Sequence, residues 1–176
     1  AVGLSGKDAD LIKAQPLQRS SRDPDSQIER LLDLGFVGDP KVINPAVLQK
    51  FAQADIIPVI APIGFGDNAE TYNINADTVA GAIASALGAA KLIMMTDVEG
   101  LLDQTRTLVP RLSPDEAQVM LRDGTVKGGM IPKVETCLAT VKGKTEAAHI
   151  LDGRVPHVLL LEVFTAHGVG TMIVDD

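Results

Sequence analysis

The sequence predicts an α/β fold in which helices cover both faces of an open, mostly parallel sheet. Short apolar runs, typical of buried strands, alternate with longer segments whose apolar residues recur every three or four positions, as in helices. Proline, glycine and capping residues mark the ends of these segments. Strands that alternate with helices in this way favour parallel pairing, because a parallel crossover needs a connection about as long as a helix.

The first half of the chain predicts two strands and one extension. Residues 1–4 and 56–60 are apolar runs that look like strand interiors. Because the chain opens inside such a run rather than on methionine, we expect further residues to precede it. Residues 15–30 are rich in Ser, Arg, Asp and Pro, which predicts an exposed loop or hairpin.

A helix is expected over residues 75–88. Asn75 is the predicted N-cap, and Gly88 is the predicted stop. Between them runs one apolar stripe, made of Ala76, Val79, Ala80, Ile83, Ala84 and Leu87. A buried strand follows at residues 92–95.

Ser113 and Glu116 form a capping box around Pro114, which predicts a helix that ends near Gly124. Another apolar stripe predicts a helix over residues 129–141, and it includes Cys137, which we interpret as a core residue. Residues 147–151 predict a strand. A last helix from Pro156 to about Val163 and a strand at 171–174 complete the pattern.

Composition narrows the functional class. A net charge of −7 and 3% aromatic residues argue against a nucleic-acid surface. The single cysteine argues against a disulfide framework or a cysteine-based metal cluster, and the three histidines lack metal-ligand spacing. No metal site is therefore expected. No apolar run approaches the roughly 20 residues of a membrane helix, so we expect no membrane contact and a cytoplasmic location.

Residues 128–133 are candidates for phosphate chemistry. Lys133 falls in the first turns of the helix expected after Gly128 and Gly129. There, helix N–H groups and the helix dipole favour anions, and an ammonium group could reach a bound phosphate. A solvated surface lysine behind a flexible loop is the alternative.

Residues 72–77 are the second candidate segment. Asn73 and Asn75 flank Ile74, so both amides face one side of an extended segment and suit a carboxylate or amide ligand. A cap plus a turn explains them equally well. Asp77 could orient nearby lysines, or could simply favour the helix dipole.

Residues 96–100 follow a predicted strand directly. In an open α/β sheet, ligands bind beyond the carboxyl ends of the strands, so this loop is a natural nucleotide contact. A polar strand exit without function is the alternative.

These motifs, in this order, resemble the carboxyl-terminal portion of the acetylglutamate kinase branch of the amino-acid kinase family. The resemblance runs along essentially the whole chain. It rests on residues 2–8, 34–38, 58–64, 72–81, 96–102, 128–134 and 168–173. The segments 72–77 and 128–133 are its most specific parts.

The resemblance implies a carbamate-kinase-like fold and transfer of the γ-phosphoryl group of ATP to the side-chain carboxylate of N-acetyl-L-glutamate. That reaction gives an acyl phosphate and belongs to arginine biosynthesis. It further implies that Asn73, with Asn75 beside it, contacts acetylglutamate, that Lys133 stabilises charge on the transferred group, and that Asp77 organises the catalytic lysines. Mg²⁺ would arrive with ATP and be held mainly by phosphate oxygens.

By the same resemblance, residues 1–75 are the remainder of an acetylglutamate-binding lobe, and residues 76–176 are the nucleotide-binding lobe. The ATP contacts it implies are Thr96, Asp97, Val98, Glu99, Gly100, Leu101, Leu102, Thr125, Val126 and Lys127.

The chain also departs from the family pattern. The family's upstream half, with a second catalytic lysine, glycine-rich turns and a substrate-binding arginine, has no match here, so we expect this chain alone to be inactive. The complete enzyme is expected to be a homo-oligomer. Arginine as a feedback inhibitor would contact Glu162, Gly168 and Gly170. A nucleotide- or arginine-sensing module, or a kinase of another amino-acid carboxylate, are the open alternatives.

Overall fold

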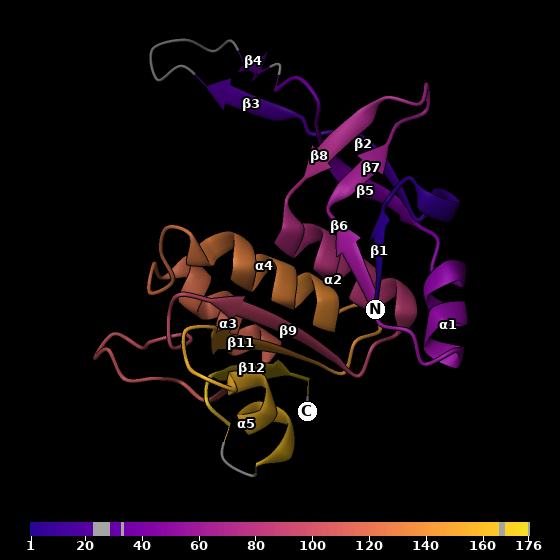
Figure 1. Cartoon of the computed structure of the whole chain (residues 1–176). Coiled ribbons are helices and arrows are strands. Elements are labelled where there is room, and N and C mark those ends of the chain that lie inside the picture. The colour runs from indigo at the N-terminus through magenta and orange to yellow at the C-terminus, as the bar shows by residue number, and fades with distance from the viewer. Residues whose placement is uncertain (23–28, 33, 166–167, 176) are drawn as a thin grey trace. The chain divides into compact units, whose positions relative to one another are not determined.

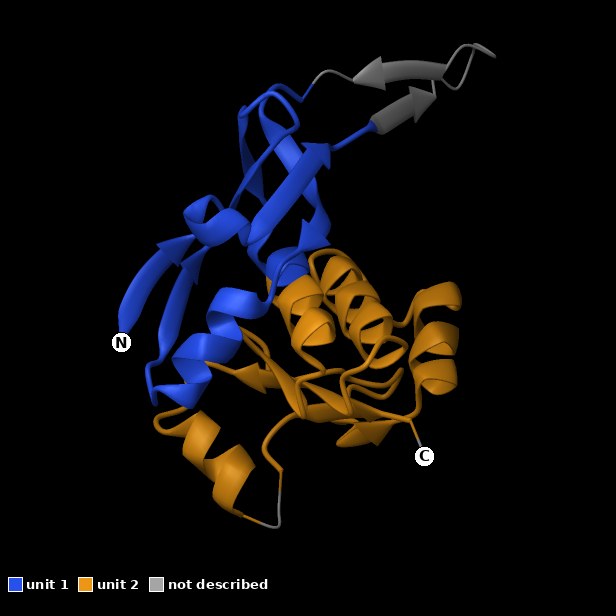
Figure 2. Cartoon of the chain, turned by 90° about the vertical axis from the view of Figure 1, so that its right-hand side faces the viewer, with its two compact units in different colours: residues 1–79 blue, residues 80–176 orange. Residues whose placement is uncertain are grey.

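The computed structural model describes residues 1–22, 29–32, 34–165 and 168–175 (Figure 1). The chain divides into two compact units, Ala1–Val79 and Ala80–Asp176, which Figure 2 shows in blue and orange. Each unit has its own sheet structure.

A small barrel forms the centre of the first unit. Its strands are β2 (Ile12–Pro16), β5 (Val37–Ile43), β8 (Thr71–Ile74) and β7 (Ile63–Phe65), which close in that order. Pairs β2–β5 and β7–β8 are antiparallel, whereas β5–β8 and β2–β7 are parallel. Ile12, Ala14 and Ile74 are buried in the first unit. A Cβ at Gly64 would come within 2.8 Å of the Ala14 Cβ, so only glycine fits there.

A second, parallel pair joins β1 (Val2–Ser5) to β6 (Pro58–Ala61), with Val2 opposite Pro58. Helix α1 (Ala46–Gln53) precedes β6, and a 3₁₀ turn (Asp8–Asp10) follows β1. The predicted strand start at 56 was two residues too early. Asp55 has a left-handed backbone (φ 54°), and Ile57 is 70% exposed, because the chain is still leaving the helix there.

Strands β3 (Arg19–Arg22) and β4 (Glu29–Leu32) pair antiparallel, with Arg19 opposite Leu32. The loop or hairpin expected over 15–30 falls on this pair. Its middle, residues 23–28, lies outside the described residues.

The second unit is built on one four-stranded sheet, in the order β10 (Arg111–Leu112), β12 (Thr171–Val174), β11 (Ala147–Asp152) and β9 (Lys91–Thr96). Strands β9 and β11 are parallel, from Lys91 opposite Ala147 to Thr96 opposite Asp152. Strand β12 runs antiparallel to β11 and parallel to β10. Every residue of β11 is buried, as a central strand with covered faces requires.

Helices cover both faces of this sheet. Helices α3 (Pro114–Arg122) and α4 (Met130–Val141) lie on one face and α5 (Val158–Phe164) on the other (Figure 1). Helix α2 (Ala76–Leu87) starts in the first unit and continues into the second. The core between the sheet and helices contains Met94, Leu112, Ala117, Val134, Cys137, Leu138, Ala148, Ile150 and Ile173, all buried. The prediction that Cys137 is a core residue is confirmed.

Most helix ends predicted from capping residues and glycines are confirmed. Asn75 Oδ1 accepts hydrogen bonds from the N–H groups of Asp77 (2.9 Å) and Thr78 (3.2 Å), and Gly88 has a φ of 59°. Ser113 and Glu116 form the predicted capping box. The last helix begins at Val158 rather than Pro156, because His157 adopts a left-handed conformation (φ 60°) that interrupts helical geometry.

The predicted α/β class is therefore confirmed, with parallel pairs in the sheets and helices on both faces of the second. The barrel of the first unit and the antiparallel strand β12 are features that the sequence did not predict.

Candidate functional site

A pocket of about 190 Å³ lies in the second unit. Two segments more than twenty residues apart in the sequence meet around it. It is lined by Val98, Gly100, Leu101, Leu102, Thr125, Val126, Lys127 and Met130. The structure thus brings together parts of the two segments in which the sequence analysis expected ATP contacts.

The pocket combines an apolar interior with a polar surround. Leu101 and Val126 are 2% and 5% exposed, whereas Lys127 is exposed. A broader depression of about 520 Å³ adjoins it and shares Leu102, Thr125 and Lys127. Asp103, Gln104, Arg106, Asp123 and Gly124 complete its lining. Such an arrangement suits a flat apolar group that carries polar substituents.

The first wall of the pocket is the base of a hairpin-like loop over residues 101–109. Val109 N–H donates to the Leu101 carbonyl oxygen over 2.9 Å, and Leu102 pairs with Leu108. At the tip, Asp103 Oδ1 accepts from the N–H groups of Thr105 and Thr107. These bonds, with the Thr105 hydroxyl as the largest contributor, lower the pKa of Asp103. The loop is therefore held by its own polar groups.

The second wall is a turn after α3. Gly124 has a φ of 76°, a conformation that favours glycine. Asp123 Oδ1 accepts from Thr125 N–H over 2.8 Å, and Val126 N–H donates to the Met120 carbonyl oxygen over 3.0 Å. These bonds fix residues 125–127 against the helix that precedes them.

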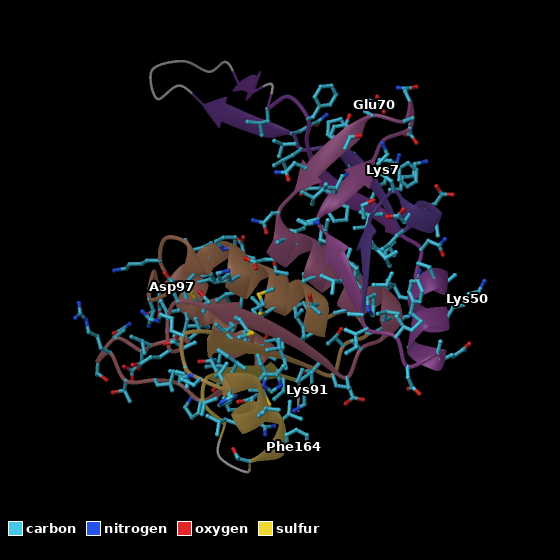
Figure 3. All side chains as sticks on the ribbon, viewed as in Figure 1. Lys7, Lys50, Glu70, Lys91, Asp97 and Phe164 are labelled. Atoms are coloured by element: carbon cyan, nitrogen blue, oxygen red, sulfur yellow. The ribbon has the colours of Figure 1, made fainter. Side chains whose placement is uncertain are left out.

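Three further predicted contacts, Thr96, Asp97 and Glu99, are not among the described residues that line the pocket. Thr96 ends β9, and Asp97 follows it at the carboxyl end of that strand (Figure 3). Their roles stay predictions.

The carboxyl end of the neighbouring strand, β11, carries an ion pair that sequence reasoning missed. Arg154 Nε and Nη2 donate to the two oxygens of Asp152 over 2.9 and 2.8 Å. The side-chain bond from Arg154, followed by its backbone N–H, lowers the pKa of Asp152 to about 2. The Asp152 carboxylate in turn raises the pKa of Arg154, and the charges of Asp97 and Glu99 add to this effect. An Asp-Gly pair directly after an apolar run was the available signal.

Helix α4 begins at the pocket, where Met130 lines the cavity. Gly128 has a φ of 57°, and Gly129 is the N-cap. Among the described residues, no side chain caps this helix. Lys133, half-buried, lies three residues after Met130 and so on the same side of the helix. Met130 falls within the apolar stripe predicted over residues 129–141, a pattern that indicates a core residue rather than a pocket residue.

The predicted acetylglutamate contacts lie in the first unit. Asn73 is exposed on β8, and its N–H donates to the Phe36 carbonyl oxygen over 2.9 Å. Asn75 serves as the α2 cap described above. Asp77 lies in the first turn of α2. Because Asp77 belongs to the first unit and Lys133 to the second, their expected cooperation stays a prediction.

Glu162, predicted as an arginine contact, has a partner on each carboxylate oxygen. His149 Nδ1 lies 2.7 Å from Oε1, and Val169 N–H donates to Oε2 over 3.1 Å. A Cβ at Gly170 would overlap the Ile150 carbonyl oxygen, so close packing against β11 already explains that glycine. A cation at this place would have to compete with these contacts, and the arginine site stays a prediction.

Within the described part of the chain, no group of three or more His, Cys, Asp or Glu side chains is arranged to hold a metal ion. None of the helices described here has the length and apolar character to cross a membrane.

The fold defines a class of protein, the α/β proteins in which helices cover both faces of a sheet that contains parallel strands. The chain belongs to the amino acid kinase family, whose model matches residues 1–152. It is 62% identical over 173 residues to acetylglutamate kinase from Rhodospirillum centenum, covering 98% of this chain and 57% of that protein. The corresponding Rhodospirillum rubrum protein is 59% identical, with 98% and 56% covered. The chain thus spans just over half the length of these relatives.

Solved structures share the fold. N-acetylglutamate synthase from Neisseria gonorrhoeae, complexed with coenzyme A and L-arginine, matches 100% of this chain and 38% of its own, with a TM-score of 0.82 and 26% identity. The Streptococcus mutans protein smu.665 matches with a TM-score of 0.71 and 29% identity, over 95% of this chain and 58% of its own. Carbamate kinase from Giardia lamblia, at 18% identity and a TM-score of 0.64, covers 92% and 53% and supports the fold alone.

Proposed function

We propose that this chain carries the nucleotide site of an N-acetyl-L-glutamate kinase, which transfers the γ-phosphoryl group of ATP to the side-chain carboxylate of N-acetylglutamate. The observation that carries the proposal is the pocket, in which residues 98–102 and 125–127 meet at the start of α4. Relatives at 54–62% identity that are named acetylglutamate kinase supply the choice of acceptor.

The apolar interior of the pocket suits the adenine base, and its polar surround suits the ribose. The phosphates then extend toward the N-terminus of α4, where the helix dipole and Lys127 favour anions. Lys133 stabilises charge on the phosphoryl group in transfer. Mg²⁺ enters with ATP, held mainly by phosphate oxygens and water.

The acceptor carboxylate is already a nucleophile, so no strong general base is required. Catalysis then consists of positioning two anions and neutralising charge on the transferred group. In this proposal residues 1–75 belong to the acetylglutamate lobe, with Asn73 as a substrate contact, and residues 76–176 form the nucleotide lobe. The complete enzyme is a homo-oligomer.

The nucleotide site can be tested on the chain itself by calorimetric titration of MgATP. Leu102 lines both the pocket and the adjoining depression and is 39% exposed, so Leu102→Glu should preserve the fold. It should weaken MgATP binding by at least about tenfold, because it places a carboxylate beside the bound anion. Val119→Glu is the matched control, since Val119 is 56% exposed on α3 and outside both linings. Equal affinities of Leu102→Glu and wild type would contradict this placement of ATP.

A second candidate function is a binding module that senses arginine without phosphoryl transfer. The likeness to a synthase crystallised with L-arginine favours it. This candidate would be supported if a complete protein bound L-arginine and ATP but formed no acyl phosphate.

A further inference from the structure

The hydroxyl group of Thr171 bridges the two arms of the pocket hairpin. Thr171 is the first residue of β12 and is 1% exposed. Its Oγ1 accepts a hydrogen bond from Leu101 N–H over 2.8 Å and donates one to the Val109 carbonyl oxygen over 2.7 Å. One buried hydroxyl therefore satisfies a donor and an acceptor that lie at opposite sides of the hairpin base.

The bridge replaces a bond that an ordinary hairpin makes directly. In an antiparallel hydrogen-bonded pair, the two residues exchange both N–H···O=C bonds. Leu101 and Val109 make one of them directly, from Val109 N–H to the Leu101 carbonyl oxygen over 2.9 Å. The second passes from Leu101 N–H through the Thr171 hydroxyl to Val109. The hairpin base is thereby fastened to strand β12.

The neighbouring sequence fits this arrangement. A Cβ at Gly100 would come within 2.7 Å of Thr171 Oγ1 and 2.8 Å of Leu108 Cδ1, and Gly100 has a φ of 145°. Thr171 itself is held in register, because it pairs with Ile150 of the fully buried strand β11. Gly100 and Leu101, the residues beside the bridge, both line the pocket.

We propose that Thr171 is a positioning residue for the nucleotide pocket, because its hydroxyl sets the place of Gly100 and Leu101 in the pocket wall. The proposal rests on the proposed nucleotide function. It adds to that site a residue that lies about seventy positions along the sequence from the pocket wall that it holds in place. Thr171 is not a catalytic residue, since it acts only through the hairpin.

The test compares Thr171→Val, which removes the hydroxyl at nearly constant volume, with Thr171→Ser, which keeps it. Thr145→Val is the matched control, because Thr145 is also buried (3% exposed) and its hydroxyl has no hydrogen-bond partner among the described residues. If Thr171→Val does not fold, Thr171→Cys gives the same comparison, because a thiol is a weak donor and acceptor. The 176-residue chain is used throughout. Amide exchange of Leu101 by NMR reports the bridge, and calorimetry with MgATP reports the pocket.

In Thr171→Val, exchange of the Leu101 amide should accelerate and MgATP affinity should fall, each by at least about tenfold, because a buried hydrogen bond is lost. Thr171→Ser should stay close to wild type in both measurements, and Thr145→Val should change neither. Unchanged Leu101 protection or unchanged MgATP affinity in Thr171→Val would overturn the proposal. If wild type binds no MgATP, the proposed function fails instead, and Leu101 exchange alone decides whether Thr171 positions the loop.

Discussion

His149 is an ionisable residue in an unusual place, at the centre of the second unit's sheet. Its side chain is 1% exposed, Nδ1 faces Glu162, and Nε2 has no partner within the described part of the chain. Burial lowers the pKa of His149, and the neighbouring carboxylate only partly opposes this effect. The neutral ring is therefore the form that the fold favours.

This arrangement predicts a pH dependence of stability. Because the pKa of His149 is lower in the folded state than its ordinary value of 6.5, the unfolded chain takes up the proton first as pH falls. The free energy of unfolding should thus decrease as pH drops below about 6.5, toward the folded pKa. Urea unfolding of wild type between pH 7.5 and 5.5 should show this decrease, and His149→Gln should reduce its slope.

Exposed His157 provides the control for this measurement. His157→Asn suits its left-handed backbone (φ 60°) and should leave the pH slope as in wild type. A slope that persists in His149→Gln would mean that other groups control the acid response.

At the scale of a single element, the start of α4 depends on two adjacent glycines that differ in conformation. Gly128 has a φ of 57°, which penalises any side chain, whereas Gly129 has a φ of −65° in the helical region. A Cβ at either position would meet nothing within 4 Å. The difference between them is therefore backbone conformation alone.

Gly128→Ala should lower the free energy of unfolding by about 1–2 kcal/mol, the cost of a left-handed alanine. Gly129→Ala should leave it unchanged or raise it by up to about 1 kcal/mol, because alanine restricts the unfolded chain at a compatible position. Urea unfolding of both variants checks the pair. Equal losses of stability in the two variants would mean that the cost comes from contacts of the added methyl group rather than from the backbone φ.

Helix boundaries could be predicted because their signals are local. The Ser113–Glu116 capping box and the Asn75 cap are each made by groups two or three residues apart, so the sequence contains both partners side by side. The barrel could not be predicted in the same way. Strand β5 pairs with β8, and Val37 lies opposite Asn73, a partnership that no local pattern records.

The residues of the candidate site also differ in whether the sequence alone could identify them. Resemblance to a family identified segments 96–102 and 125–127, and the structure brought parts of both to one pocket. Met130, Arg154 and Thr171 were missed because each is an ordinary residue in its local pattern. Thr171 matters only through bonds to Leu101 and Val109, which lie 70 and 62 residues away.

At the scale of the whole molecule, the decisive fact is length. The region aligned with the Rhodospirillum centenum kinase includes 98% of this chain but only 57% of that kinase. The pocket lies within the second unit, so our proposal expects this chain to bind MgATP without the remainder of such an enzyme. Phosphoryl transfer does require that remainder, in our proposal, because the family's second lysine and its substrate-binding arginine have no match in this chain.

We therefore predict that MgATP and N-acetyl-L-glutamate give no hydroxylamine-trapped acyl phosphate with this chain alone. A chimera that adds the part of the Rhodospirillum centenum kinase without a counterpart here should give product. Lys133→Ala in the chimera should reduce kcat by roughly 10²–10³-fold, the usual effect of losing one group that stabilises transition-state charge. The Lys142→Ala chimera serves as a control, because Lys142 is exposed at the other end of α4, and it should retain most of its activity.

Each outcome tests a different part of the proposed function. Product from the 176-residue chain alone would show that its own residues suffice, and the predicted inactivity would be wrong. A chimera that binds MgATP without forming acyl phosphate would favour the sensing module or another acceptor. If the Lys133→Ala chimera loses activity and the control chimera does not, the lysine in the first turns of α4 is what makes phosphoryl transfer fast.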